Sequence, residues 1–400
     1  MKIIFLTLLD FKSYNEHNIY CDLLREFIKD GHDVYCISPI EKKKGGETHF
    51  EENGRLLKLK IGNTQKTNII EKGISTLMIE PQFVSAVKKY FADVKFDMVL
   101  YSTPPITLAK TVQYIKNRDN AKTYLMLKDI FPQNAVDLGL MSKSGLKGII
   151  YRYFRKKEKE LYALSDKIGC MSQANVDYII KHNKDVPADK VEVCPNCIDI
   201  QDVSLTDAEK AEIREKYGIP QDKKVFIYGG NLGKPQGIHF LVECLKSQKE
   251  NDDVFFLVIG DGTEYHKLEE YVKEEKPNNV KLSKLIPRKD FDRLVAASDV
   301  GMIFLDRRFT IPNFPSRLLS YMQAGVPVLA CTDTNTDIGK VVVDGGFGWW
   351  CKSGDVDGFS EKLSEALVAD TKSMAEAEKA YLEENFSAEK VSHKITNICD

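Results

Sequence analysis

The sequence predicts an α/β protein made of two Rossmann-like doubly wound domains that face a central cleft. Three observations lead to this prediction. The chain has 400 residues, too many for one compact core. Short apolar segments alternate with amphipathic segments of helical period, and this alternation is typical of a parallel sheet covered on both faces. A polar, turn-rich segment at 198–221 separates two such arrays.

The first array predicts six strands with helices between some of them. Gly31 ends the first helix, as glycine commonly does. The predicted strands lie at 2–9, 32–39, 97–103, 123–129, 167–172 and 190–195, and the predicted helices at 18–31, 106–117 and 144–166. We therefore expect a first Rossmann-like domain over residues 1–200.

The second array repeats the pattern. The predicted strands lie at 224–230, 254–262, 279–287, 299–305 and 327–331, and the predicted helices at 237–249, 264–275, 289–297 and 315–324. This array predicts a second Rossmann-like domain over 201–370. The charged helical segment at 371–400 is expected to pack back toward the N-terminal domain.

Composition excludes several classes of function. A net charge of −2 gives no global field to attract nucleic acid, so no nucleic-acid partner is expected. No apolar run approaches the ~20 residues that span a bilayer. The apolar N-terminus is broken by Asp10 and Lys12 and reads as a buried strand rather than a signal peptide. We expect a cytoplasmic protein, at the inner face of the cell membrane if it meets lipid.

Cysteine usage indicates reduced thiols. The nine cysteines are an odd number scattered along the chain, unlike a disulfide framework. Cys194 and Cys197 form the one close pair, but no helix opens at the first and no second ligand pair follows at a matching distance. The pair therefore does not favour a redox or zinc site.

Glycines and a lysine follow the predicted strand at 224–230. Gly230, Asn231, Gly233 and Lys234 come directly after its apolar residues. Glycine lets backbone N–H groups approach an anion closely, and the lysine supplies a point charge. The spacing fits neither a Walker A loop nor GxGxxG. A phosphate-binding loop and a plain tight turn are equal interpretations of this segment.

Two other strand ends are weaker signals. Gly260 lies in a Gly-Asp-Gly turn, which is a common connection from a strand into a helix. Ile286 precedes Pro287 and Arg288, at a strand end that would lie against a flat base. Neither segment specifies a ligand by itself.

The predicted helix at 315–324 opens the most informative segment, 313–330. Pro315 fits the first turn of a helix, with one of the two preceding residues as its cap. Ser316 and Arg317 then stand in the opening turn. Free N–H groups, the positive end of the helix dipole and a guanidinium would form a cradle for a diphosphate there. The alternative is an ordinary helix start with a surface arginine.

Taken in order, these segments resemble the family 4 glycosyltransferases of the GT-B fold, especially those of bacterial capsule and O-antigen synthesis. The shared pattern of the second half is Gly-Asn-x-Gly-Lys, Gly-x-Gly, Pro-Arg, Pro-Ser-Lys/Arg and Gly-x-Pro-Val. Similar landmarks stand at 102–105, 129–133, 139–140, 195–199 and 344–348. The resemblance covers nearly the whole chain, and the order of the motifs is more specific than any one of them.

The resemblance implies roles for particular residues. It implies that the domain at 201–370 binds a nucleotide-sugar donor, a UDP-sugar, and that the domain at 1–200 binds a saccharide or lipid-linked acceptor. Lys234 and Arg317 would act on the donor diphosphate, Ile286 would lie beside the base, and Asp129 would face the transferred sugar or the acceptor. The full donor-binding set implied is Gly230, Asn231, Gly233, Lys234, Gly260, Ile286, Arg288, Ser316, Arg317, Leu318 and Ser320.

The sequence departs from the family pattern at several positions. Ser320 stands where the family has a glutamate that holds the ribose hydroxyls, and Pro312 stands where an earlier glutamate is expected. A serine can share one hydrogen bond with a ribose but cannot act as a charged acceptor. Gln133 and Cys197 also replace the usual Glu and Gly. These departures concern the donor site and leave the order of the family motifs unchanged.

Sugar transfer requires stabilisation of the negative charge on the departing nucleoside diphosphate. A segment with the spacing of a metal-binding Asp-x-Asp motif stands at 355–357, and we interpret it as a turn and helix cap. A helix N-terminus with Lys234 and Arg317 would stabilise the same charge without a metal. We therefore expect no metal and no cofactor, and the resemblance implies retention of the anomeric configuration.

Two features have alternative interpretations of about equal weight. Asp129 would serve as a base or cap the next helix. The helix at 144–166 carries an apolar stripe (Leu146, Ile149, Ile150, Tyr153 and Phe154) and a cationic remainder (Lys143, Lys147, Arg152, Arg155, Lys156, Lys157 and Lys159). It suits peripheral contact with an anionic membrane, or packing on the sheet with a solvated charged face; we slightly favour the membrane.

Three functions fit the sequence. The first is a glycosyltransferase. The second is a GT-B nucleotide-sugar epimerase, which would need carboxylates and a histidine such as His17 or His239 at the site. The third is a non-catalytic donor-binding or scaffold subunit of a polysaccharide assembly complex, suggested by the serine at 320.

Overall fold

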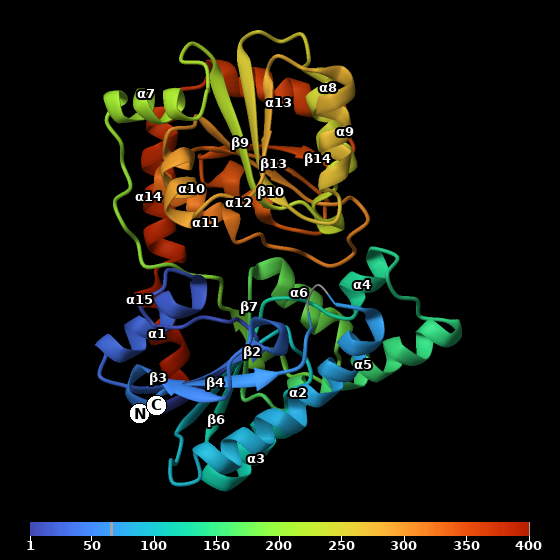
Figure 1. Ribbon diagram of the computed structural model, residues 1–400, viewed down its shortest axis with the longest axis vertical. Helices are drawn as coiled ribbons and strands as arrows, with labels where there is room; N and C mark the ends of the chain where they lie inside the picture. Colours follow the sequence, from blue (N-terminus) through green and yellow to red (C-terminus); the bar gives the residue numbers. More distant parts are fainter. Residues whose placement is uncertain (65–66, 400) are drawn as a thin grey trace. The chain divides into compact units, whose positions relative to one another are not determined.

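The computed structural model describes residues 1–64 and 67–399, and the chain divides into two compact units (Figure 1). Unit 1 comprises Met1–Asp199 and Ser387–Asp400, and unit 2 comprises Ile200–Phe386. Residue 400, the last of the expected C-terminal segment, lies outside the described residues.

Unit 1 is built on a parallel sheet whose strands, among the described residues, follow the order β3-β4-β2-β1-β5-β6-β7-β8. Only the pair of β3 with β4 is antiparallel within that part of the chain. The strands are β1 (Lys2–Leu6), β2 (Asp33–Glu41), β3 (His49–Glu51), β4 (Leu56–Ile61), β5 (Met98–Ser102), β6 (Lys122–Leu127), β7 (Lys167–Cys170) and β8 (Val191–Val193).

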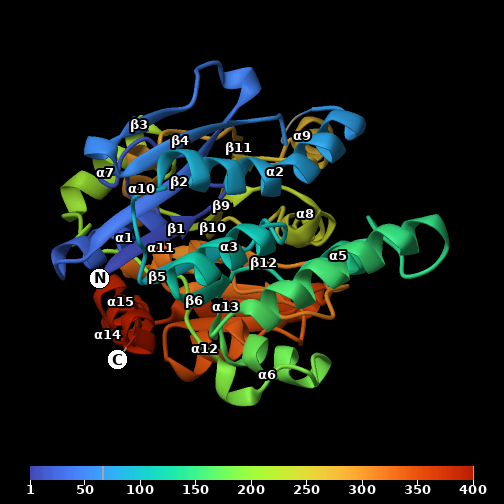
Figure 2. The ribbon, with the colours of Figure 1, turned by 90° about the horizontal axis from the view of Figure 1, so that it is seen from below.

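Helices cover both faces of this sheet (Figure 2). One face packs on α1 (Ile19–Lys29) and α15 (Ala388–Thr396), which share a buried core with β1, β2 and β5. The other face carries α2 (Ile69–Tyr90), α3 (Ala109–Asp119) and α5 (Gly145–Leu164). The shorter α4 (Gln133–Asp137) and α6 (Gln173–His182) complete the unit's α-helices among the described residues. Strands apolar throughout are thus buried on both sides, as the pattern predicted.

The strand pair β3 and β4 of unit 1 was not predicted. The segment 45–67 carried no readable signature, and it contains β3 and β4; residues 65–66 of it lie outside the described residues. Lysines interrupt the apolar run of β4, so its periodicity is hidden. Lys58 is nevertheless buried, because its ammonium contacts Asp10 Oδ1 at 2.6 Å and Ser38 Oγ at 2.9 Å.

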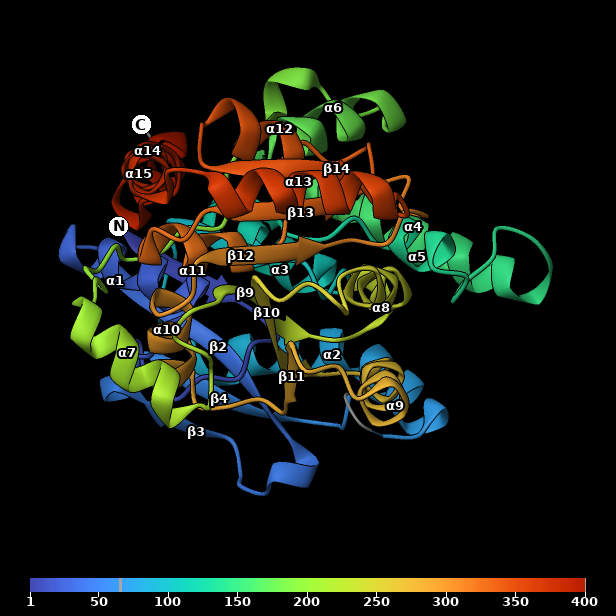
Figure 3. The ribbon, with the colours of Figure 1, turned by 90° about the horizontal axis from the view of Figure 1, so that it is seen from above.

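Unit 2 is built on a parallel sheet with the strand order β11-β10-β9-β12-β13-β14 among the described residues (Figure 3). The strands are β9 (Lys224–Asn231), β10 (Val254–Asp261), β11 (Val280–Ser283), β12 (Val300–Phe304), β13 (Val328–Thr332) and β14 (Gly348–Lys352). The helices α8 (Ile238–Ser247), α9 (Tyr265–Glu275) and α13 (Val356–Val368) bury one face in a continuous core.

Four further helices belong to this unit: α10 (Arg288–Ala296), α11 (Arg317–Ala324), α12 (Ile338–Asp344) and α14 (Thr371–Asn385). The helix α11 packs between α10 and α14, and α12 packs against β13 and β14. In the expected C-terminal segment, α14 contacts α11 of unit 2, whereas α15 contacts α1 of unit 1.

The segment 198–221 is not only a linker. It contains α7 (Asp207–Lys216), which begins with a capping box between Thr206 and Glu209. Arg214 anchors this helix in unit 2 by donating to the carbonyl of Ala297 at 2.9 Å and to Asp299 at 2.7 Å. The sequence pattern did not predict α7, because few of its residues are apolar. Hydrogen bonds and an ion pair of Arg214, rather than an apolar stripe, hold this helix in place.

The predicted fold class is confirmed: the protein is α/β, with two Rossmann-like units. Within residues 1–64 and 67–399, no helix combines the length and apolarity needed to cross a membrane.

Candidate functional site

The strand order of unit 2 places a topological switch point between β9 and β12. From β9 the chain builds outward through β10 and β11, and from β12 it builds outward in the opposite direction. Ligands of open α/β sheets bind outside the carboxyl ends of the strands at such a point. The loop after β9 and the start of α11, which follows β12, are therefore expected to line the site.

The loop after β9 is held close to the end of β10 by glycines. A Cβ on Gly260 would lie 2.2 Å from the carbonyl oxygen of Gly230, and one on Gly262 would lie 2.4 Å from the Leu232 backbone. Leu232 donates its N–H to the carbonyl of Asp261 at 3.0 Å. The predicted site residue Gly260 thus has a packing reason to be glycine, while Gly230, with φ +114°, needs glycine for its backbone conformation.

Asn231 and Lys234 lie at the accessible end of this loop, whereas Gly233 between them is buried. Asn231 and Lys234 are exposed, and Asn231 Nδ2 donates to Gln236 Oε1 at 3.1 Å. Lys234 makes no ion pair with any residue that the structure describes. A Cβ on Gly233 would meet the Asn231 side chain at 3.1 Å. The loop therefore presents an amide and a cation at the switch point.

The helix that carries the second half of the site starts later than predicted. α11 begins at Arg317 with Ser316 as its N-cap, so Pro315 precedes the helix instead of opening it. The Pro315 carbonyl accepts the N–H of Leu318 at 3.2 Å in a tight first turn. Ser316 is exposed and its side chain makes no capping bond, and the N–H groups of a first turn have no partner inside the helix.

Arg317 lies over an aromatic ring beside the glycine loop. Its guanidinium carbon is 4.3 Å from the centroid of Tyr228, and its Nη2 is 3.8 Å from the position a Cβ on Gly230 would take. Its Nη1 is buried and has no hydrogen-bond partner among the described residues. A buried donor without a partner is costly, and an anion at this position would satisfy it. The glycine loop and Arg317, predicted separately, are thus brought together.

Ser320 lies one turn further along α11 and contacts another predicted residue. Arg288 Nη2 donates to Ser320 Oγ at 3.2 Å, and Arg288 Nε donates to Asp292 Oδ1 at 2.8 Å. The position where the family carries a glutamate is therefore occupied by a hydroxyl that accepts from a guanidinium. Ile286 is half-buried in the loop between β11 and α10, beyond the end of the strand.

Leu318 differs from the other predicted donor residues. Its side chain is fully buried, and its N–H is used by the Pro315 carbonyl. The structure gives this residue a packing role in the core beneath α11.

Three residues near the switch point were missed by sequence reasoning. Tyr228 supplies the ring beneath Arg317. Asn313 has a buried Nδ2 without a partner among the described residues, and its carbonyl accepts from Thr336 Oγ1 at 2.5 Å. Asp333 follows β13, and burial raises the pKa of its carboxyl. The polar run at 332–337 after an apolar strand was the available signal for the last of these.

Asp129 lies in unit 1, at the carboxyl end of β6. Asn134 Nδ2 donates to both carboxylate oxygens at 2.7 Å. Burial raises the pKa of Asp129 to about 6, although the bonds from Asn134 act to lower it. The helix-cap alternative does not hold, because α4 has Pro132 as its N-cap without a side-chain capping bond. A carboxyl with a pKa near 6 can exchange a proton close to neutral pH.

The motifs considered for metal or redox chemistry have structural roles. Cys194 and Cys197 are fully buried, and burial raises the pKa of both thiols, which makes them poor nucleophiles and ligands. Asp355 caps α13 by accepting the N–H of Gly358 at 2.9 Å, as predicted. No group of three or more His, Cys, Asp or Glu side chains in the described ranges could hold a metal ion.

The histidines named for the epimerase alternative have exposed rings. His17 Nδ1 is 3.7 Å from the buried carboxylate of Asp22, and His239 Nδ1 is 3.4 Å from Glu243 on α8. Neither imidazole ring is buried in the protein.

Comparison with known families gives both units an assignment. Residues 209–384 match the model described as glycosyl transferases group 1, and residues 18–202 match the model of glycosyltransferase family 4. The chain carries two glycosyltransferase domains.

Two bacterial proteins resemble the chain over much of its length. The transferase is 24% identical over 332 residues to the protein named "Probable glycosyltransferase WbjE" of Pseudomonas aeruginosa, covering 82% of this chain and 80% of that protein. It is 22% identical over 251 residues to WcaI of Escherichia coli, named for colanic acid biosynthesis, covering 62% and 60%.

Solved structures share the fold of the transferase. Sucrose-phosphate synthase of Thermosynechococcus elongatus aligns with a TM-score of 0.77 at 14% identity, covering 100% of this chain and 98% of that chain. HepE of Anabaena, solved in complex with UDP, aligns with a TM-score of 0.69 at 15% identity, covering 100% and 99%. These neighbours are GT-B glycosyltransferases, which confirms the predicted fold.

Proposed function

We propose that this transferase moves a sugar from a nucleoside diphosphate donor, a UDP-sugar, to a saccharide or lipid-linked saccharide in bacterial surface polysaccharide synthesis. Retention of configuration and independence from metal are part of the proposal. The names of WcaI and of HepE complexed with UDP-glucose support the polysaccharide context and the donor class. The proposed location is the cytoplasm, where nucleotide-sugars are made.

The observation that carries the proposal is the buried Nη1 of Arg317, whose guanidinium also lies over the ring of Tyr228. Its Nη1 is buried without a partner in the part of the chain that the structure describes, beside the glycine loop of β9 and at the start of α11. A diphosphate bound there would accept from this donor and from free N–H groups of the helix start. The exposed ammonium of Lys234 lies on the same loop system and would add a second positive charge.

This arrangement suits the bond changes of sugar transfer. The bond between the anomeric carbon and the β-phosphate oxygen breaks, and the acceptor hydroxyl oxygen forms a new bond to that carbon. The hydroxyl proton passes to the departing phosphate on the same face, so the configuration is retained. Cations fixed before the reaction stabilise the negative charge that develops on the diphosphate.

Asp129 is proposed to contact the transferred sugar or the acceptor at the edge of the unit 1 sheet. Its carboxylate is held by two hydrogen bonds from Asn134, and a raised pKa of about 6 leaves it ionised above that pH. Ionised, it would accept a hydrogen bond from a sugar hydroxyl.

A donor panel tests the proposal. The purified chain is incubated with UDP-, GDP- and dTDP-sugars and a saccharide acceptor, and nucleotide release and product mass are followed with and without EDTA. We expect UDP release and a product one glycosyl unit heavier, unchanged by EDTA.

Other outcomes would contradict parts of the proposal. Release that stops with EDTA would contradict metal independence. Binding of donors without release in the presence of any acceptor would favour a donor-binding subunit. Conversion of the donor to its epimer without transfer would favour the epimerase.

A further inference from the structure

The first half of α5 exposes an apolar stripe. Leu146, Ile149, Ile150 and Tyr153 follow the spacing i, i+3, i+4 and i+7, which places them on one face of the helix. Leu146 is 85% exposed, Ile149 57% and Ile150 51%. A helix that packs on a sheet buries such a stripe, so packing does not account for these residues.

The same helix is packed normally in its second half. Leu161 and Tyr162 are buried, and Phe154 stacks edge-on against Phe131 at 5.1 Å. Figures 1 and 2 show that the start of α5 extends beyond the neighbouring helices of unit 1. The stripe is therefore exposed because the helix projects past the elements that would cover it.

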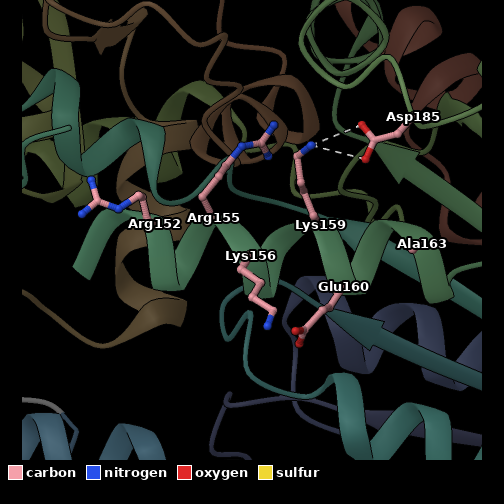
Figure 4. A pocket seen from close by; sticks show the side chains of 7 residues that line it. All are labelled: Arg152, Arg155, Lys156, Lys159, Glu160, Ala163 and Asp185. Carbon is pink, nitrogen blue, oxygen red and sulfur yellow. Dashed lines mark hydrogen bonds and ion pairs between the residues drawn. The ribbon is translucent and has the colours of Figure 1, made fainter. Parts of the chain in front are cut away.

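Cations flank the stripe. Four cations, Arg152, Arg155, Lys156 and Lys159, line an open hollow along α5 together with the carboxylates of Glu160 and Asp185 (Figure 4). Arg155 is held by Glu158 and Lys159 by Asp185. Arg152 and Lys156 have no ion-pair partner within residues 1–64 and 67–399. The segment 143–159 contains seven Lys and Arg and one Glu, whereas the whole chain has a net charge of −2.

A second exposed apolar patch belongs to the neighbouring helix α2. Ile74, Leu77 and Met78 are exposed on one face of α2, within two turns of Glu80. Glu80 Oε2 is 3.6 Å from the ammonium of Lys157, which follows the α5 stripe by one further turn. This ion pair joins α2 and α5 at positions that follow the exposed patch on each helix.

Charge decides which partner fits this surface. A second copy of the chain would bring the same cations together, and like charges facing each other oppose association. An apolar stripe flanked by cations is the pattern of a helix that lies in a membrane interface, with apolar side chains among the acyl chains and cations at anionic headgroups.

We propose that the first half of α5, together with Ile74, Leu77 and Met78 of α2, docks unit 1 on an anionic lipid bilayer. The inference does not depend on the donor or acceptor of the transferase, because it rests only on the exposed apolar side chains and their flanking cations.

Sedimentation of the full chain with vesicles tests the proposal. Vesicles of phosphatidylcholine alone and with 30% phosphatidylglycerol are compared at low and physiological salt. Because each cation near an anionic surface contributes roughly fivefold in affinity, we expect Arg152→Glu with Lys156→Glu to lower binding more than about tenfold. Replacing Leu146 and Ile150 with glutamine, a good helix former, should lower binding by about a hundredfold.

The control replaces Val368 of α13 with glutamine, because Val368 is 86% exposed and belongs to unit 2 rather than to the proposed docking surface of unit 1. Vesicle binding should be unchanged in this variant. Thermal unfolding followed by circular dichroism should match the wild type in the control and in both surface variants. No binding to phosphatidylglycerol vesicles, or equal binding by the Leu146/Ile150 variant, would overturn the proposal. So would a concentration-dependent dimer that the same variant abolishes.

Discussion

Arg317 in unit 2 and Asp129 in unit 1 are the two charged residues proposed to act in transfer, and the structure satisfies them differently. The Arg317 Nη1 is buried without a partner among the described residues, whereas both oxygens of Asp129 accept from Asn134 at 2.7 Å. One hydrogen-bond donor of the arginine therefore lacks a partner until an anion binds. The carboxylate of Asp129 has hydrogen-bond partners without a ligand, and its burial raises its pKa.

This difference separates two ways in which a charge serves a site. A preorganised donor without a partner stabilises an anion at no cost of reorganisation. A hydrogen-bonded carboxylate of raised pKa can take up or release a proton near neutral pH. Each of the following predictions perturbs one side of this comparison.

The largest effect is expected for Arg317→Ala. Loss of this guanidinium should slow donor turnover by about 10²–10³-fold, because one charged donor to the developing diphosphate is removed. The measurement is nucleotide release under saturating acceptor. Arg293→Ala, which removes an exposed arginine from α10, is the matched control and should retain the wild-type rate. A wild-type rate in Arg317→Ala would contradict the cradle.

The second effect concerns Asp129. With a pKa of about 6, its ionised form accumulates above that pH, so the rate should rise between pH 5 and 7. Asn134→Ala removes the hydrogen bonds that lower this pKa, and the rising limb should move to higher pH. Asp129→Asn should lower the rate about a hundredfold and abolish the limb.

The exposed carboxylate of Asp177 provides the control for this pH series. Asp177→Asn should leave the profile unchanged. A limb near pH 6 that persists in Asp129→Asn would show that another group titrates.

A smaller effect is expected for Ser320→Glu. The new carboxylate would stand beside Arg288, which already donates to Ser320 Oγ at 3.2 Å, and would offer a charged acceptor to the ribose hydroxyls. UDP should bind roughly tenfold more tightly by calorimetry, as a charge-assisted hydrogen bond replaces a neutral one. Ser320→Gln, without the charge, should show little gain. Unchanged affinity in the glutamate variant would mean that position 320 does not contact the ribose.

The smallest effect on function is expected for Glu378→Gln. Glu378 is a second buried ionisable side chain without a hydrogen-bond partner among the described residues. It lies in α14 with 0% exposure, and burial raises the pKa of its carboxyl well above the usual value. A carboxyl whose pKa is raised in the folded state contributes to stability only at low pH, where it is protonated. This contribution is lost as the pH rises through the folded-state pKa. Glu378→Gln should raise the melting temperature at pH 8 more than at pH 5.

UDP affinity should not change in Glu378→Gln. A change would mean that the unpaired carboxyl contributes to the donor site, and the contrast with Arg317 would fail.

Much of the fold could be predicted because strand burial left a clear apolar signal. The alternation located β1, β2, β9 and β10, and the strand ends carried the glycines of the loop after β9. The strand β4 was missed because Lys58 is buried through ion pairing and interrupts the run. The helix α7 was missed because Arg214 and a capping box hold it rather than an apolar stripe.

The site was predicted best where residue type alone fixes the role. Gly230 and Arg317 were chosen by chemistry, and the structure brings them together. Leu318 was included by motif position, but its side chain belongs to the core. Tyr228 could not be found, because only the three-dimensional packing shows that the ring of a buried strand residue lies beneath Arg317.

The most direct test of the central claim is calorimetric titration of UDP into the full chain in the presence of EDTA. We expect wild type and Arg293→Ala to bind UDP equally, and Arg317→Ala to bind at least about a hundredfold more weakly, since it lacks the donor that the diphosphate would satisfy. Equal affinity for UDP in wild type and Arg317→Ala would contradict the account.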